Sequence, residues 1–173
     1  MILNKFCVNL LMVFLPFMGF AQHGEVAISF EALADSLAKH PKPIIVNVYT
    51  DWCTYCSMQE NGIKKSAELS ATLGKEMYYL KLNAENRENI SFNHKQYHFK
   101  PNGPSTGIHE LVLELGKDSK DIAYPMWFIL DARYKVQYSF SGYLKPKDLN
   151  TLLLAYLKAE KTQLSNRVSE GIN

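Results

Sequence analysis

The chain has 173 residues, of which 47% are hydrophobic and 21% are charged. This length fits one domain, with or without a targeting segment, and supplies enough apolar residues to bury a core. The formal net charge is only +2, which indicates neither a nucleic-acid partner nor binding to an anionic surface.

Residues 1–21 have the features of a secretory signal peptide. Lys5 provides a short positive region, and residues 8–20 are apolar but too few for a comfortable membrane span. Gly19 and Ala21 place small residues three and one positions before a cut at Gln22. An uncleaved N-terminal anchor is the alternative. We expect cleavage and export to the periplasm or cell envelope.

The chain contains three cysteines, Cys7, Cys53 and Cys56. Cys7 lies inside the predicted signal peptide and does not follow the expected cut, as a lipid-attachment cysteine would. Cleavage would therefore leave one cysteine pair in the mature chain. Export would place this pair in an oxidising compartment, where disulfides form and persist.

The predicted domain begins with a short amphipathic helix and a buried strand. Ser29 is a suitable N-cap for a helix over residues 30–39, and the prolines that follow end that helix. Residues 44–49 form a β-branched and aromatic run, which is typical of a buried strand.

The motif Trp52-Cys53-Thr54-Tyr55-Cys56 follows this strand, where the next helix should begin. A thiol at a helix N-terminus faces unpaired backbone N–H groups, which together with the helix dipole stabilise a thiolate. The second thiol lies one turn further along, so the motif predicts a redox dithiol. The helix is expected to run towards residue 73, with a bend at Asn61-Gly62 and an end at Gly74.

Further strands are expected at residues 77–83, 126–130 and 135–140, the last two joined by a turn at 131–134. Pro146 begins a final helix whose apolar residues have the spacing of a core-facing stripe. Residues after about 161 are polar, and we expect a frayed tail over 162–173. The predicted domain therefore spans residues 22–161.

Over most of residues 25–160 the chain resembles the thioredoxin-fold family. The resemblance rests on the motif after a strand, the residues Lys81-Leu82-Asn83, the Tyr124-Pro125 step into strand 126–130, and Gly142 before the last helix. It implies an α/β thioredoxin-like fold, with a central mixed β-sheet flanked by helices. Residues 49–53 are most similar to those of secreted or periplasmic relatives, including the C-terminal thioredoxin domain of DsbD.

The resemblance implies a role for each matching residue. Cys53 would attack a substrate disulfide as a thiolate, and Cys56 would resolve the mixed disulfide. Pro125 would be the family's cis-proline beside the cysteines. The backbone of Tyr124, just before it, would pair with a bound substrate strand.

Trp52, Thr54 and Tyr55 flank the two cysteines. Trp52 would shield the pair from water, although ordinary packing explains it equally well. Thr54 and Tyr55 would contact substrate, and the identity of this dipeptide helps to set the reduction potential. No number follows from it, so the direction of electron flow stays open. The similarity to the reductant-delivering DsbD domain favours a reductase.

The acid–base residues depart from the family pattern. Asn47 stands six residues before Cys53, where thioredoxins usually have a buried aspartate. Glu60 occupies the place of a second acid in the DsbD-like domain, and it is our candidate for tuning the pKa of Cys56. A solvated surface carboxylate is the alternative. With Asn47 present, Lys81 is expected to point outward or to pair with Glu60, and Asp51 to be a surface residue.

The 41 residues between Asn83 and Pro125 are more than twice what a minimal thioredoxin needs. We expect an exposed insertion over about 85–107, which either selects partners or has no specific role, and then a helix over 108–115. His94 and His98 are four apart, so on a helix they would share one face. With His109 or the cysteines they could then bind zinc or copper.

Three classes of function follow. The first is a thiol–disulfide oxidoreductase of the cell envelope that acts on exported proteins, with no cofactor beyond the Cys53–Cys56 pair. A membrane electron donor of the DsbD type is its expected partner, and we expect a monomer. The second is a copper- or zinc-handling protein, and the third is a binding module in which the disulfide is only structural.

Overall fold

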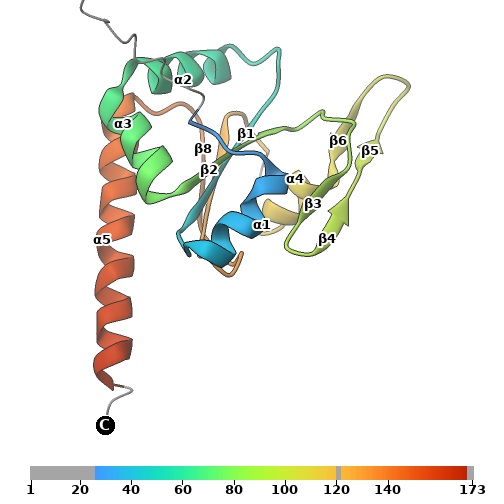
Figure 1. Cartoon of the computed structure of the whole chain (residues 1–173). Coiled ribbons are helices and arrows are strands. Elements are labelled where there is room, and N and C mark those ends of the chain that lie inside the picture. Colours follow the sequence, from blue (N-terminus) through green and yellow to red (C-terminus); the bar gives the residue numbers. More distant parts are fainter. Residues whose placement is uncertain (1–25, 120–121, 171–173) are drawn as a thin grey trace, which may run out of the picture.

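The computed structural model describes residues 26–119 and 122–170, so the predicted signal peptide lies outside the described residues. A four-stranded sheet in the order β2-β1-β7-β8 forms the centre (Figure 1). Its strands are β1 (Ile44–Tyr49), β2 (Tyr78–Asn83), β7 (Met126–Leu130) and β8 (Val136–Ser141). β1 is parallel to β2 and antiparallel to β7, and β7 is antiparallel to β8. The sheet is therefore mixed, as expected.

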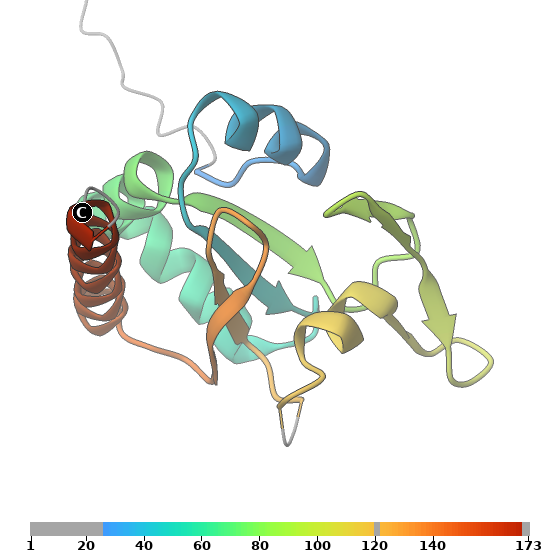
Figure 2. The same ribbon diagram turned by 90° about the horizontal axis from the view of Figure 1, so that it is seen from below.

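Helices cover both faces of this sheet because successive side chains of β1 point to opposite sides. Ile44, Val46 and Val48 belong to a core that includes residues of α1 (Phe30–Lys39) and α4 (Glu110–Leu115). Ile45 belongs to a second core with α2 (Thr54–Lys65), α3 (Ala67–Ala71) and α5 (Pro146–Glu170). Figure 2 shows α1 on one side of the sheet and α5 on the other.

The helix after the motif is interrupted later than predicted. Gly62 stays inside α2, and the break falls at Ser66, whose backbone is extended. The Ser66 hydroxyl accepts a hydrogen bond from the backbone N–H of Leu69 (3.3 Å) and so caps α3. A π-helical turn, η1 (Thr72–Glu76), follows, so Gly74 does not end the helix. The prediction of a bend at Asn61-Gly62 was wrong because a capping serine, not the glycine, starts the new helix.

The insertion forms two small hairpins. β3 (Ile90–Phe92) pairs with β4 (Lys95–Tyr97), and β5 (Phe99–Pro101) pairs with β6 (Gly107–His109). Asn93 and His94 both have positive φ, which is the backbone of a two-residue hairpin turn. The predicted helix over 108–115 begins only at Glu110, because Ile108 and His109 belong to β6.

The C-terminal helix α5 continues to Glu170, well past the predicted boundary at residue 161 (Figure 1). The expectation of a frayed tail directly after residue 161 was therefore wrong. Residues 162–170 contain neither glycine nor proline, so nothing in the chain interrupts the helix. In the part of the chain that the structure describes, no helix is long and apolar enough to cross a membrane.

Candidate functional site

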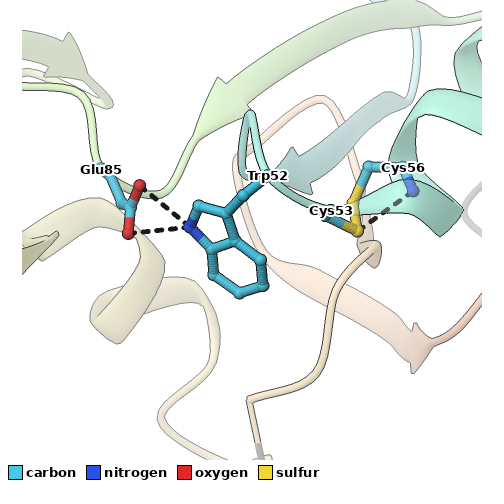
Figure 3. Close-up of a disulfide and its surroundings, with 4 residues drawn as sticks. All are labelled: Trp52, Cys53, Cys56 and Glu85. Carbon is cyan, nitrogen blue, oxygen red and sulfur yellow. Dashed lines mark hydrogen bonds between the residues drawn. A yellow bond between two sulfur atoms is a disulfide. The ribbon is translucent and has the colours of Figure 1, made fainter.

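The two cysteines lie where β1 passes into α2. Cys53 is the N-cap residue of α2 and forms a disulfide with Cys56, with 5.2 Å between their Cα atoms. The backbone N–H of Cys56 donates a hydrogen bond to Cys53 Sγ (3.1 Å; Figure 3). This N–H is one of the first-turn donors that a helix leaves without an intrahelical partner. The sulfur of Cys53 therefore occupies the place where a helix N-terminus best supports negative charge.

Little of either cysteine reaches solvent, with exposed fractions of 8% for Cys53 and 6% for Cys56. Two neighbouring side chains of α2 are more open, since Tyr55, between the cysteines, and Met58, after them, are both exposed. The disulfide is thus recessed beside exposed apolar side chains. Such side chains give an incoming polypeptide apolar surface to bury.

Tyr124 and Pro125 lie immediately before β7, which is next to β1 in the sheet. Their peptide bond is cis, and the carbonyl oxygen of Pro125 accepts a hydrogen bond from the Gly142 N–H (2.8 Å). The Tyr124 ring contacts the Trp52 ring edge to face, with 6.1 Å between centroids. The structure therefore brings Tyr124 to Trp52 of the motif across 72 positions of sequence.

Trp52 does not pack in the interior, because 68% of it is exposed. Its indole N–H donates to both carboxylate oxygens of Glu85, at 3.2 Å each (Figure 3). Burial raises the pKa of the Tyr124 phenol, and the negative charge of Glu85 raises it further. Trp52, Tyr124 and Glu85 therefore form one group beside the disulfide.

Glu60 lies one turn after Cys56 on α2, and its carboxylate pairs with two lysines. Glu60 Oε2 is 3.1 Å from Lys81 Nζ, and Oε1 is 3.0 Å from Lys64 Nζ. The expectation that Lys81 would pair with Glu60 is confirmed. The role of Glu60 in tuning the pKa of Cys56 stays a prediction.

Asn47 lies on β1 opposite Lys81 in the register and is buried. Within residues 26–119 and 122–170, its amide nitrogen has no hydrogen-bond partner. Because an amide does not ionise near neutral pH, it offers Lys81 no negative charge. The positive charge of Lys81 is met by Glu60 instead. Asp51 is exposed, as expected, and accepts a hydrogen bond from Asn83 Nδ2 (3.0 Å).

The ion pairs of Glu60 predict a pH-dependent contribution to stability. Burial raises the pKa of Glu60, but hydrogen bonds from Lys64 and Lys81 and their positive charges outweigh it, so the pKa lies below its ordinary value of 4.5. A carboxylate with a depressed pKa stabilises the folded state above its ordinary value, and this stabilisation is lost as pH falls through the folded value. We expect Glu60→Gln to lower the unfolding free energy by up to about 1 kcal/mol at pH 7.

Below pH 4.5 this difference between wild type and Glu60→Gln should shrink towards zero. Urea unfolding at pH 7, 5, 4 and 3 measures it, with Glu88→Gln, an exposed carboxylate in the insertion, as the matched control. A difference that stays constant down to pH 3 would contradict the ion-pair assignment.

The predicted histidine site required His94 and His98 to lie on one helix, and the structure forms short strands and turns there instead. His94 lies in the turn between β3 and β4, and His98 lies between β4 and β5, where its Nδ1 is 2.8 Å from Asn89 Oδ1. His109 is fully buried, and its ring nitrogens contact the Leu111 N–H (3.2 Å) and the Glu88 carbonyl oxygen (3.1 Å). Burial lowers the pKa of His109. Among the described residues, no group of three or more His, Cys, Asp or Glu side chains could hold a metal ion.

Glu85 and Asn83 are the residues of this site that the sequence-based reasoning missed. A signal was present, since parallel neighbouring strands end at the same edge of a sheet. In the structure β2 is such a parallel neighbour of β1, and the register pairs Asn83 with Tyr49. The first residues after each strand could therefore have been placed together. Instead Glu85 was counted only as the start of a polar insertion.

The fold and the site define a class of protein, a thioredoxin-like fold with a Cys-x-x-Cys disulfide at the start of α2. No family model matches the sequence, and no curated protein gives a significant match. A solved disulphide isomerase from Xylella fastidiosa Temecula1 is similar with a TM-score of 0.50 and 18% identity, over 73% of this chain and 86% of the other.

A thioredoxin-fold protein from Helicobacter pylori is similar with a TM-score of 0.45 and 17% identity, over 80% of this chain and 90% of the other. The likeness to the Xylella protein supports the thioredoxin-like fold. At 18% identity it supports no narrower family.

Proposed function

We propose that the protein is a thiol–disulfide oxidoreductase that exchanges disulfides with exported proteins through Cys53 and Cys56. The observation that carries this proposal is the position of Cys53 Sγ, which caps α2 and accepts the Cys56 N–H at 3.1 Å. In the reduced protein, the same N–H and the helix dipole would stabilise a Cys53 thiolate. The thiolate is the reactive form of a cysteine.

The exchange proceeds in two steps. The Cys53 thiolate attacks one sulfur of a substrate disulfide, the substrate S–S bond breaks, and the second substrate sulfur leaves as a thiolate that takes a proton from solvent. Cys56 then loses its proton and attacks Cys53 Sγ, which forms the Cys53–Cys56 bond and releases the first substrate sulfur. The protein has lost two electrons and the substrate has gained two. The product is the disulfide present in this structure.

A purely structural disulfide fits this position less well. The two cysteines are only three positions apart, and the entropy that a cross-link removes from the unfolded chain falls as the closed loop shortens. The bond also joins the N-cap residue of α2 to a residue of its first turn, a segment that the helix already orders. It therefore connects no two separate parts of the fold.

The reductase direction and the place in the cell envelope rest on sequence features. The residues around the motif resemble those of the DsbD domain, and residues 1–21 resemble a signal peptide. In this direction a membrane donor of the DsbD type would return two electrons to Cys53–Cys56 after each turnover. The substrates would be exported proteins with disulfides.

Reduction of a dye-quenched insulin disulfide, with dithiothreitol as the source of electrons, tests the proposal. We expect the folded protein to accelerate the reaction at least about tenfold over a synthetic peptide of residues 50–58, because only the fold places Cys53 at an ordered helix N-terminus. No acceleration, together with a disulfide that resists mild reductant, would support the structural reading instead. Stoichiometric copper or zinc bound by the reduced protein would support metal handling.

A further inference from the structure

His109 joins three separate segments of the protein from a fully buried position. It is the last residue of β6 and the N-cap residue of α4, and its ring nitrogen Nδ1 accepts the backbone N–H of Leu111 (3.2 Å). The other ring nitrogen, Nε2, is 3.1 Å from the Glu88 carbonyl oxygen in the insertion. The backbone N–H of His109 donates to the carbonyl oxygen of Ala84, the residue after β2 (2.7 Å). One histidine therefore connects the insertion and α4 to the end of the central sheet.

The two ring contacts fix the protonation state of His109. A backbone N–H can only donate and a carbonyl oxygen can only accept, so Nδ1 must be unprotonated and Nε2 must carry the proton. A second proton, on Nδ1, would place a donor against the Leu111 N–H. That hydrogen bond would be lost, and a donor of a fully buried residue would have no partner at the start of α4. The contact therefore requires the neutral imidazole.

The charged groups around the ring do not reverse this preference. Burial, the largest cause, lowers the pKa of His109, and the nearby His98 ring lowers it further. The hydrogen bond at Nε2 and the negative charge of Glu110 act in the opposite direction. Arg87 and Glu88, on the segment that supplies the carbonyl group, have exposed side chains. The net result is a pKa below the ordinary value of 6.5.

We propose that His109 is an acid-sensitive latch, which holds the insertion and the first turn of α4 against the end of β2 while its ring is neutral and releases them when the ring is protonated. This inference goes beyond the proposed exchange function, because it concerns the closure of the insertion. Ala84 precedes Glu85, whose carboxylate accepts the Trp52 indole N–H next to the disulfide (Figure 3). The release therefore begins beside the disulfide.

The release should begin as pH falls below 6.5. In an opened segment the ring is exposed to water and takes up a proton near its ordinary value of 6.5, whereas the closed segment keeps the ring neutral to a lower pH. The closed state is therefore fully stabilised above pH 6.5 and loses this stabilisation as pH falls towards the folded pKa. At one pH unit below 6.5, the open population should have increased by at most about tenfold.

NMR of protein with ¹⁵N-labelled histidine tests the latch at the ring itself. The chain has five histidines, and the signal that is missing in His109→Asn assigns the ring of His109. We expect the Nε2–H tautomer at pH 7.5 and a titration midpoint below 6.5. The Nδ1–H tautomer, or a midpoint at or above 6.5, would overturn the proposal, whether or not the protein exchanges disulfides.

Hydrogen exchange followed by mass spectrometry tests the release. In wild type, the protection factors of the amides in residues 86–111 should fall about threefold to tenfold between pH 7.5 and 5.5. In His109→Asn they should change less than about twofold, since asparagine caps a helix through its side-chain oxygen but does not titrate. In His109→Ala the cap is absent, so they should lie about fivefold to thirtyfold below wild type at pH 7.5.

His94→Asn is the matched control for this measurement. It removes an exposed histidine of the same insertion, at a positive φ that asparagine tolerates, and it should keep the pH dependence of wild type. Two exchange results would overturn the latch. One is a pH dependence in His109→Asn as large as that of wild type, because another group would then drive the loss. The other is equal protection of residues 86–111 and of β1 and β7 at pH 5.5, because the whole domain would then be unfolding.

Discussion

Replacing Cys53 by serine is expected to reduce disulfide exchange to the uncatalysed background rate. A serine hydroxyl is not ionised near neutral pH and forms no stable bond with a disulfide sulfur, so the first step of the exchange cannot occur. The loss should be in the chemical step and not in folding, since serine is also a favoured N-cap residue for α2. Insulin reduction and urea unfolding of the same preparation separate these two effects.

Cys56→Ala is the matched partner of this experiment. It leaves Cys53 able to attack but removes the thiol that resolves the mixed disulfide, so the protein should accumulate joined to its substrates. Non-reducing electrophoresis followed by mass spectrometry would show these species and name the substrates. Exchange that persists in Cys53→Ser, or mixed disulfides that form through Cys56 alone, would contradict the assigned order of attack.

Phe128→Ala is expected to lower the unfolding free energy by about 3–5 kcal/mol. Phe128 is fully buried at the middle of β7, a central strand of the sheet. It belongs to the core that packs against α1 and α4, close to Gly116, which caps the end of α4. Truncation would leave a cavity between the sheet and α4. The total stability of a domain is about 5–15 kcal/mol, so this is a large share of it.

Urea unfolding at neutral pH with the disulfide intact measures this loss. Phe128→Leu keeps most of the buried volume and should cost clearly less than Phe128→Ala. Leu154→Ala is the surface control, because 48% of Leu154 is exposed on α5, and it should change the unfolding free energy by about 0.5 kcal/mol or less. Equal losses in Phe128→Ala and Leu154→Ala would contradict the assignment of Phe128 to the core.

The sequence by itself determined the elements whose physical causes are local. Residues 126–130 are a continuous apolar run, and residues 44–49 are apolar apart from Asn47; each is a strand buried on both faces of the sheet. Ser29 caps α1 through its own hydroxyl, which accepts the Ala32 N–H at 3.2 Å. The Cys-x-x-Cys pair at a strand-to-helix junction was equally readable, because its three-residue spacing suffices to bring the sulfurs together.

Helix interruptions and the shape of the insertion depended on weaker signals. Asn61-Gly62 is a stronger helix breaker than Ser66 by propensity alone, yet Gly62 faces Pro146 of α5, whose Cγ would be 3.0 Å from an added Cβ. Packing against α5 thus keeps a glycine inside α2. The polar residues 85–107 have no clear period, so their two hairpins were not predicted.

Only the tertiary structure decided which side chains surround the disulfide. Glu85, Trp52 and Tyr124 come from three separate segments, which meet because β1 lies between β2 and β7 in the sheet. The sequence left two positions open for Lys81, and the structure decides between them because Glu60 reaches Lys81 from α2. Contacts of this kind depend on strand order and register, which no local pattern of residues encodes.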